Sequence, residues 1–346
     1  MPTNVAIGCQ GGGSHTAFTA GVLRTLLPAL AASEYRLVGL SGTSGGAISA
    51  ATALSGYLDD GAEGAINTLD ALWGDIAATQ GFQAWLNNWL VRSMQTHHSA
   101  VPMPTVSPYD VPGTAYGERK LRELLERHVD VEALSALADP DSPHLVVGTV
   151  NVNAGRFETF EDEHVTVDAL LASAAVPTLF RAVEIDGHYH WDGLFSQNPP
   201  IQELLQTDPD RKPEELWVVQ INPQTCEGEP TDVADIVDRR NELAGNLSLN
   251  QELRFVETVN HWIAEGDLPA DQYSHTEIRR ISLGEQLSFE SKLDRSPAFI
   301  ERLTARGIEA AEAFLDDLDD GHEHAAQFGS SHHEERRREQ PDYSDE

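Results

Sequence analysis

The chain has 346 residues, which is long enough to bury a large core as one α/β domain or as two smaller domains. Its 56 Asp and Glu residues outnumber its 23 Lys and Arg residues, which gives a formal net charge of −33. Because nucleic acid and anionic lipid surfaces repel such a charge, we expect no nucleic-acid partner.

The types of charged residue also predict adaptation to salt. Lysine occurs only at Lys120, Lys212 and Lys292. Abundant carboxylates with scarce lysine suggest a halophilic protein, because molar salt screens the self-repulsion of the surface. With only Cys9 and Cys226, the chain lacks a disulfide framework. The sequence shows no leader segment and no apolar run of membrane-spanning length, so we expect a cytoplasmic location.

The first predicted unit is a strand, a glycine loop and a helix. The apolar run at residues 4–9 breaks into Gly11, Gly12 and Gly13, and apolar residues then recur at helical spacing over residues 18–30. Backbone N–H groups in such a loop are uncovered and suit a phosphate or an oxyanion. The spacing does not match the G-x-G-x-x-G fingerprint, and the lysine of a P-loop is missing.

The second predicted unit places a serine at a strand-to-helix turn. A strand at residues 36–40 and a helix at residues 47–58 flank Ser44, which lies between Gly42 and Gly46. Such a turn lifts the serine hydroxyl out of the sheet and needs very small residues on either side. The N-terminus of the following helix points at negative charge that develops beside the serine. This geometry is typical of a nucleophile. Because two such units imply a parallel sheet, we expect the glycine loop and Ser44 to meet at the carboxyl ends of adjacent strands.

An aromatic stretch follows in the region that joins these units to the rest of the chain. Aromatic and apolar residues recur at helical spacing over residues 82–94 and include Trp85 and Trp89. Such a helix is typical either of plain core packing or of a cap that receives an acyl chain. We name Trp85 and Trp89 as candidate substrate contacts.

The middle of the chain predicts two pairs of strands and a small-residue helix. Asp186-Gly187 is a two-residue turn signal, and the hairpin around it ends at Asp192-Gly193. An isolated Asp-Gly is ordinarily a simple turn. The predicted strands are 144–150, 156–160, 183–185 and 188–191, and the helix is 167–175.

The remaining elements end in a polar tail. Asn198-Pro199 predicts an N-cap followed by a proline in the first turn of a helix. Residues 216–221 form an apolar strand that we expect in the interior of the sheet, and helical patterns fill residues 233–263 and 297–315. Residues 316–346 are acidic and His-rich without apolar periodicity, which predicts a disordered tail.

Four blocks carry the motifs of the chain: Gly11-Gly12-Gly13-Ser14, Gly42-Thr43-Ser44-Gly45-Gly46, Ala172-Ser173-Ala174-Ala175-Val176-Pro177-Thr178-Leu179-Phe180, and Asp192-Gly193 ahead of Asn198-Pro199. In order and spacing, these blocks resemble the patatin-like phospholipases over residues 4–222. The resemblance implies one hydrolase domain over residues 1–315, with a three-layer α/β/α fold and a mostly parallel central sheet. It also implies hydrolysis of carboxyl esters of lipids through an acyl-enzyme.

The resemblance assigns roles to particular residues. It implies Ser44 as nucleophile, Asp192 as its base, and the N–H groups of Gly11, Gly12 and Gly13 as the oxyanion hole. The chemistry supports these roles, because a carboxylate near a serine can accept its proton and return it to the leaving alcohol. No cofactor or metal is then needed, and we expect a lipid or other ester substrate, with transient membrane contact.

The chain departs from the family pattern beside the glycine loop. The family usually has a small residue, then Arg or Lys, then Gly, whereas this chain has Ser14, His15 and Thr16. A positive charge there depends on protonation of His15. Leu194 also replaces the small residue that is common after Asp-Gly.

Three alternative hypotheses compete with the Ser-Asp dyad. A Ser-His-Asp esterase on another hydrolase scaffold would use His261 or His275. A metal site would use His188, His190 and Asp192, which alternate along one strand and share a face. A non-catalytic scaffold of the same fold would bind lipid or protein without turnover.

Overall fold

The computed structural model describes residues 2–77, 107–139, 141–177, 179–206, 211–226, 228–231, 233–269 and 272–319. Its strands are β1 (Thr3–Cys9), β2 (Tyr35–Thr43), β3 (His144–Asn151), β4 (Arg156–Glu161), β5 (Val183–Ile185), β6 (His188–Asp192), β7 (Glu215–Gln220) and β8 (Glu277–Ser282).

The strands form a single sheet in the order β5-β6-β3-β2-β1-β7-β8, with β4 paired to β3 outside this path. The pairs between β3, β2, β1, β7 and β8 are all parallel, whereas β4, β5 and β6 join by antiparallel pairing. The mostly parallel sheet is therefore confirmed. We call the edge at which the parallel strands end the carboxyl edge, and the opposite edge the amino edge.

Helices connect and cover the strands. The α-helices are α1 (Ala17–Ala31), α2 (Gly45–Ile76), α4 (Pro112–His128), α5 (Val131–Leu134), α6 (Val167–Ser173), α7 (Gln202–Leu205), α8 (Val233–Glu265) and α9 (Pro297–Asp319). The short 3-10 helices are η1 (Gly13–Thr16), η2 (Ser135–Ala138), η3 (Asp162–His164), η4 (Gly193–Phe195) and η6 (Phe289–Leu293). None of the helices in these described ranges combines membrane-spanning length with a sufficiently apolar sequence.

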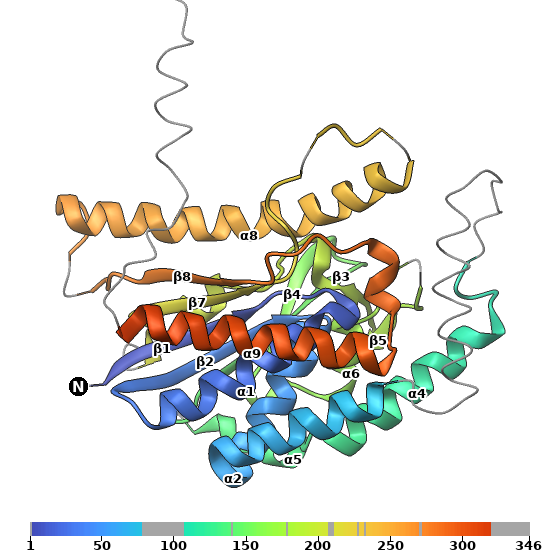
Figure 1. Cartoon of the computed structure of the whole chain (residues 1–346), viewed down its shortest axis with the longest axis horizontal. Coiled ribbons are helices and arrows are strands. Elements are labelled where there is room, and N and C mark those ends of the chain that lie inside the picture. Colours follow the sequence, from blue (N-terminus) through green and yellow to red (C-terminus); the bar gives the residue numbers. More distant parts are fainter. Residues whose placement is uncertain are drawn as a thin grey trace, which may run out of the picture.

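Alternation along the strands divides the core into two layers. In β7, Trp217 and Val219 pack in the cluster that contains α1, α2 and α9, whereas Leu216 and Val218 pack with Leu249 of α8. Successive side chains of a strand point to opposite faces, so an apolar strand is buried on both. Figure 1 shows α8 along one side of the sheet and α1, α2 and α9 on the other, which confirms the three-layer α/β/α fold.

A pair of glycines brings α9 against α1. A Cβ on Gly21 would lie 2.1 Å from the backbone oxygen of Thr304, and a Cβ on Gly307 would lie 2.1 Å from the backbone oxygen of Phe18. Only glycine permits this approach of the two helix backbones. Since η6 immediately precedes α9, the contact also fixes η6 close to the start of α1.

Several boundaries differ from the prediction. The helix after Ser44 runs as far as Ile76, with a break at Asp60 and Gly61, where Gly61 has φ +58°. The predicted hairpin around Asp186-Gly187 is confirmed, with positive φ at both residues. The strand β8 has no counterpart in the prediction, and α9 continues past residue 315 to Asp319. The stretch 82–94, with Trp85 and Trp89, and residues 320–346 lie outside the described residues.

Candidate active site

Ser44 occupies a strained turn between β2 and α2. Its φ of 56° and ψ of −129° lie outside the helical and strand regions, a conformation that a non-glycine residue adopts at an energetic cost. The following glycines let the turn pack on the end of β1. A Cβ on Gly45 would lie 2.2 Å from Thr16 Oγ1, and one on Gly46 would lie 2.3 Å from the Cys9 carbonyl oxygen. The predicted strand-to-helix turn is therefore present, with Ser44 at its tip and buried, at 7% exposure.

Ser173 supports this turn from the side of β3. The Ser44 N–H donates to Ser173 Oγ at 2.9 Å, and the Ser173 hydroxyl donates to the Gly148 carbonyl at 2.7 Å. Ser173 is completely buried, so its two hydrogen bonds are not shared with bulk water. The alanine- and serine-rich block therefore holds the turn of Ser44 against the sheet, a role that the sequence did not reveal.

The strand register brings Asp192 to the same edge. Thr43, which precedes Ser44, pairs with Gly148 of β3, and the next residue of β3, Thr149, pairs with Asp192. A Cβ on Gly193 would lie 2.9 Å from the Gly148 carbonyl oxygen, so the Asp-Gly turn closes directly on β3. Ser44 and Asp192 thus extend from positions that are level with each other, separated by one strand.

Burial dominates the electrostatics of Asp192. The side chain is completely buried, and burial raises its pKa to about 7. The Ser44 hydroxyl, the Leu194 N–H and the positive charge of Lys292 each act to lower this pKa. Asp192 Oδ1 accepts the Leu194 N–H at 2.9 Å, which fixes the orientation of the carboxyl group. A carboxylate with a pKa near neutrality is a better base at pH 7 than an ordinary aspartate.

The contact between Ser44 and Asp192 is close but not a fully formed hydrogen bond. It is strong enough to lower the Asp192 pKa, yet Asp192 Oδ2 makes no hydrogen bond of good geometry within the described part of the chain. Catalytic hydrogen bonds are often long or poorly aligned before substrate binds. The structure therefore brings the two predicted residues close together at the carboxyl edge.

The glycine loop lies directly against Ser44. A Cβ on Gly11 would lie 2.9 Å from Ser44 Cβ, so only glycine fits there. However, the Gly11 N–H donates to Asn198 Oδ1 at 2.6 Å. This corrects the expectation of three open donors, because Gly11 is already hydrogen bonded. Over the described ranges no acceptor is found for the N–H groups of Gly12 and Gly13, which remain candidate donors.

Asn198 is not the helix N-cap that the sequence predicted. The helix α7 starts four residues later, at Gln202, and the Glu252 carboxylate accepts the N–H groups of Ile201 and Gln202 at 2.8 and 2.9 Å. The Asn198 side chain turns instead toward Gly11. The local pattern was misleading because the real partner lies 187 positions away in the sequence.

His15 is a neutral, buried residue. Its Nε2 lies 2.7 Å from Ser291 Oγ, and burial lowers its pKa to about 3, with further lowering by the positive charges of Lys292 and Arg302. His15 is thus uncharged near neutral pH. His15 therefore provides no positive charge beside the glycine loop at neutral pH.

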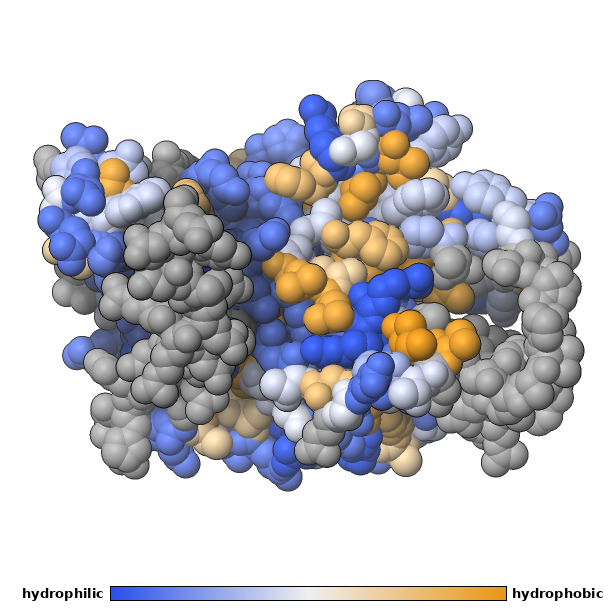
Figure 2. All heavy atoms as spheres, turned by 90° about the horizontal axis from the view of Figure 1, so that it is seen from above, coloured by the Kyte–Doolittle hydropathy of each residue, from blue (hydrophilic) through white to orange (hydrophobic). Residues whose placement is uncertain are grey.

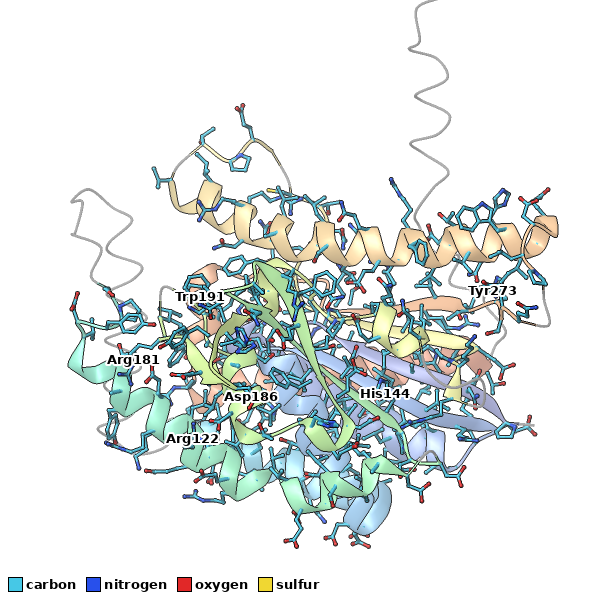
Figure 3. All side chains as sticks on the ribbon, turned by 180° about the vertical axis from the view of Figure 1, so that it is seen from behind. Arg122, His144, Arg181, Asp186, Trp191 and Tyr273 are labelled. Carbon is cyan, nitrogen blue, oxygen red and sulfur yellow. The ribbon has the colours of Figure 1, made fainter. Side chains whose placement is uncertain are left out.

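The two histidines of the alternative triad lie far from Ser44. The Asn260 side chain, next to His261, bonds the backbone of Thr276, next to His275, at 2.8 and 3.0 Å. Both histidines thus lie where β8 begins, which is at the amino edge. Figure 3 shows Trp191, the neighbour of Asp192, and Tyr273, two residues before His275, at opposite ends of the sheet.

The metal alternative receives no support from β6. His188 is exposed, whereas His190 is buried against Phe160, with its Nε2 3.6 Å from Glu158 Oε2. Within the ranges that the structure describes, no group of three or more His, Cys, Asp or Glu side chains could hold a metal ion.

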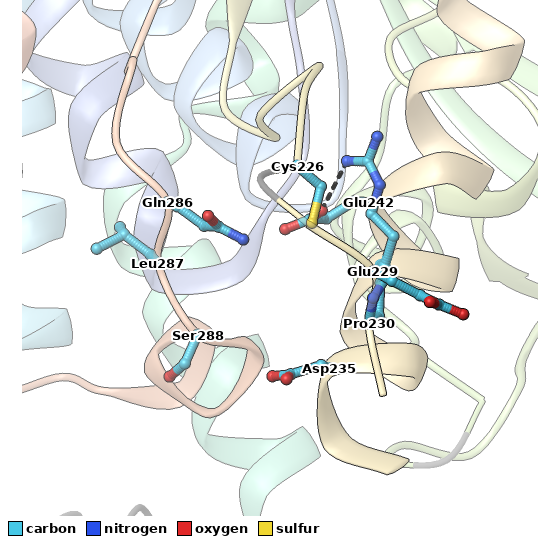
Figure 4. Close-up of a pocket in the computed structure, with 9 residues that line it drawn as sticks. Cys226, Glu229, Pro230, Asp235, Glu242, Gln286, Leu287 and Ser288 are labelled. Atoms are coloured by element: carbon cyan, nitrogen blue, oxygen red, sulfur yellow. Dashed lines mark hydrogen bonds and ion pairs between the residues drawn. The ribbon is translucent and has the colours of Figure 1, made fainter. Parts of the chain in front are cut away.

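A separate cavity of about 280 Å³ lies between the segment after β7 and the loop before η6 (Figure 4). Neither Ser44 nor Asp192 lines it, and an ion pair of 3.0 Å between Arg239 and Glu242 of α8 borders it. Its lining is mainly polar and includes three acidic residues, so we do not assign it to the ester site. The lining residues are Cys226, Glu229, Pro230, Asp235, Arg239, Glu242, Gln286, Leu287 and Ser288.

The chain was compared with protein families and with solved structures. The family model of the patatin-like phospholipases matches residues 9–205. Among solved structures, VipD from Legionella pneumophila is 14% identical, with a TM-score of 0.45, over 92% of this chain and 67% of that one. The ExoU-SpcU complex from Pseudomonas aeruginosa is 17% identical, with a TM-score of 0.34, over 91% of this chain and 52% of that one.

A search of curated protein sequences found no match. The chain spans about half to two thirds of the length of the similar solved chains. The family match covers more than half of the 346 residues and includes the strands, loops and turns that hold Ser44 and Asp192. The chain belongs to the patatin-like phospholipase family, a family of lipid ester hydrolases.

Proposed function

We propose that this protein hydrolyses carboxyl esters of lipids with Ser44 as nucleophile and Asp192 as general base. The observation that carries the proposal is the contact between a strained serine and a completely buried aspartate whose pKa is about 7. The family membership supports the reaction class. The assignment of roles to the two residues rests on their geometry and chemistry.

The proposed reaction has two steps. Ser44 Oγ attacks the ester carbonyl carbon while Asp192 accepts the hydroxyl proton, and Asp192 then returns this proton to the leaving alcohol. In the second step Asp192 takes a proton from a water molecule as its oxygen attacks the acyl carbon, and Asp192 then returns this proton to Ser44 Oγ as the acyl–Oγ bond breaks and the fatty acid leaves. The N–H groups of Gly12 and Gly13 stabilise the oxyanion in both steps, and losing one such donor typically costs about 3 kcal/mol.

An exposed apolar face on α8 supports a lipid substrate. Val233, Leu247 and Phe255 are 72%, 56% and 53% exposed, and Ile236, Leu243 and Leu247 line a shared groove. Figure 2, seen from the side of α8, shows apolar residues gathered on this face. Gly245, on the buried side of the same helix, packs on Asn198, because a Cβ there would lie 3.0 Å from Asn198 Nδ2; α8 therefore has its buried side against the candidate site and its apolar side toward solvent. We propose transient contact with uncharged lipid here.

Turnover of a fluorogenic ester and of phosphatidylcholine in mixed micelles tests the proposal in molar KCl. We expect Ser44→Ala and Asp192→Asn each to lose at least 10³-fold in kcat, with unchanged circular dichroism, because each residue acts in the transition state. His261→Asn and His275→Asn serve as matched controls, and we expect both to retain wild-type activity. Activity that persisted in Ser44→Ala, or vanished in a histidine variant, would contradict the dyad.

A further inference from the structure

We infer that Lys292 is a positioning residue of the acyl-transfer site and holds a fixed positive charge beside the glycine loop. The inference rests on the proposed function of Ser44 and Asp192. Lys292 comes from η6, 248 positions after Ser44 in the sequence, and it lies outside the matched family region.

The backbone of Lys292 packs directly on the glycine loop. A Cβ on Gly13 would lie 2.4 Å from the Lys292 carbonyl oxygen and 3.3 Å from Lys292 Cβ. The neighbouring Ser291 hydroxyl lies 2.7 Å from His15 Nε2, and His15 is itself buried. Two contacts hold η6 at this loop: its own packing on Gly13, and the docking of the following helix α9 on α1 through Gly21 and Gly307.

The Lys292 ammonium group is oriented by a polar network at the carboxyl edge. Lys292 Nζ donates to Asn222 Oδ1 at 3.1 Å, and the Asn222 N–H donates to Gln10 Oε1 at 2.8 Å. Gln10 directly precedes the glycine loop. A Cβ on Gly245 would lie 3.0 Å from Asn198 Nδ2 and 3.4 Å from Asn222 Nδ2. The lysine and the Asn198 anchor of Gly11 therefore lie on the same side of the loop.

A positive charge at this position has a specific electrostatic use. The chain carries a net charge of −33, which disfavours a further negative charge in the site. Both the Asp192 carboxylate and the oxyanion of the tetrahedral intermediate are negative. Preorganised cations stabilise such charges strongly where water is excluded. His15 is neutral, so it cannot replace Lys292 in this role.

Charged groups of η6 and α9 act on the site. The positive charge of Lys292 lowers the pKa of Asp192 on β6 and the pKa of His15 on η1. The positive charge of Arg302 on α9 also lowers the pKa of His15. Arg302 is paired with Glu285 at 2.7 Å. His190, on the same strand as Asp192, faces Glu158 at 3.6 Å instead. Removal of Lys292 should therefore raise the pKa of Asp192, because the positive charge of Lys292 acts to lower it.

The test compares Lys292→Met, Lys292→Arg and Lys212→Met in ester hydrolysis between pH 5 and 9. For Lys292→Met we expect kcat/KM to fall about 10- to 100-fold and the acid limb of the pH profile to move to higher pH. Lys292→Arg should restore most of the rate and the original midpoint. Lys212, whose Nζ lies 3.4 Å from the Gln272 carbonyl oxygen, is remote from the site, and its Met variant should match wild type.

Two outcomes would overturn the inference. In the first, Lys292→Met keeps kcat/KM within twofold of wild type and an unchanged midpoint of the acid limb. In the second, Lys292→Met and Lys292→Arg lose activity equally and both melt at a lower temperature, which would show a purely structural role. Wild-type turnover that depends on Ser44 is measured in parallel. If that turnover is absent, the proposed function itself fails, whereas its presence with an unaffected Lys292→Met variant rejects only the role of Lys292.

Discussion

The side-chain oxygen of Asn198 accepts the backbone N–H of Gly11 at 2.6 Å, across 187 positions of sequence. This bond ties the loop after β1, which supplies the candidate oxyanion donors, to the segment that follows Asp192. Asn198 is almost completely buried, so water cannot readily replace it. The two halves of the proposed machinery are therefore linked by one side chain.

We predict that Asn198→Ala lowers both stability and turnover. The variant leaves the buried Gly11 N–H without its acceptor, which should reduce the free energy of unfolding by about 1–3 kcal/mol. The loosened glycine loop should also lower kcat more than it raises KM, because oxyanion stabilisation acts in the transition state. Urea unfolding and ester kinetics check this. Gln202→Ala, at an exposed position of the same segment, is the control, and equal behaviour of the two variants would refute the prediction.

We predict that Asp192→Asn stabilises the protein more at pH 8 than at pH 5. Burial raises the folded-state pKa of Asp192 from 3.8 to about 7. The folded state thus binds more protons than the unfolded state in this window, and wild-type stability falls as the pH rises through it. The Asn side chain does not titrate, so the variant does not lose this stability. The free energy of unfolding of the variant relative to wild type should therefore rise by on the order of 2 kcal/mol from pH 5 to pH 8.

Glu252 provides the control for that experiment. Burial also raises its pKa to about 7, but it caps α7 and lies outside the proposed machinery. Glu252→Gln should show the same sign of pH dependence in urea unfolding while retaining ester hydrolysis. A stability difference for Asp192→Asn that stays constant with pH would show that Asp192 is already ionised in the folded protein at pH 5.

We predict an acid limb in the pH profile of kcat/KM with a midpoint near pH 7. Activity should fall below this pH, because a protonated Asp192 cannot accept the Ser44 proton. His15 stays neutral above its pKa of about 3, so His15→Gln should leave the midpoint in place even if it lowers the rate. A midpoint that shifted in the His15→Gln variant would show that Asp192 is not the group that sets the acid limb.

We predict that the melting temperature rises between low salt and molar KCl. A net charge of −33 repels itself in dilute buffer, and molar salt screens that repulsion. Thermal unfolding at several KCl concentrations, with an uncharged osmolyte as control, measures the effect. An unchanged or lower melting temperature in molar KCl would remove the hypothesis of salt adaptation.

The parts of the site that were predictable from the sequence depend on local signals. Ser44 lies in a turn that is flanked by glycines. A side chain on either glycine would collide with backbone that lies within a few residues or on the adjacent strand. The Asp186-Gly187 turn set the register of the hairpin that ends at Asp192. Such signals specify backbone conformation directly, so the strands and the turns that carry the proposed dyad followed from them.

The parts that were not predictable depend on contacts between distant segments. Asn198 matched a helix N-cap locally, but its oxygen is used by Gly11. The neutral state of His15 depends on burial beneath η6, and Lys292 reaches the glycine loop only because α9 docks on α1. The strand β8 is stabilised by parallel pairing with β7 rather than by a strong local pattern. None of these pairings leaves a signal at a fixed spacing along the chain.

The most direct test of the account is to locate the adduct of a fluorophosphonate probe by peptide mass spectrometry in molar KCl. The account predicts a single adduct on Ser44 of the wild-type protein, none on Ser44→Ala, and labelling of Asp192→Asn that is slowed at least 100-fold, because the serine then lacks its base. An adduct on another residue, or unchanged labelling of Asp192→Asn, would contradict it.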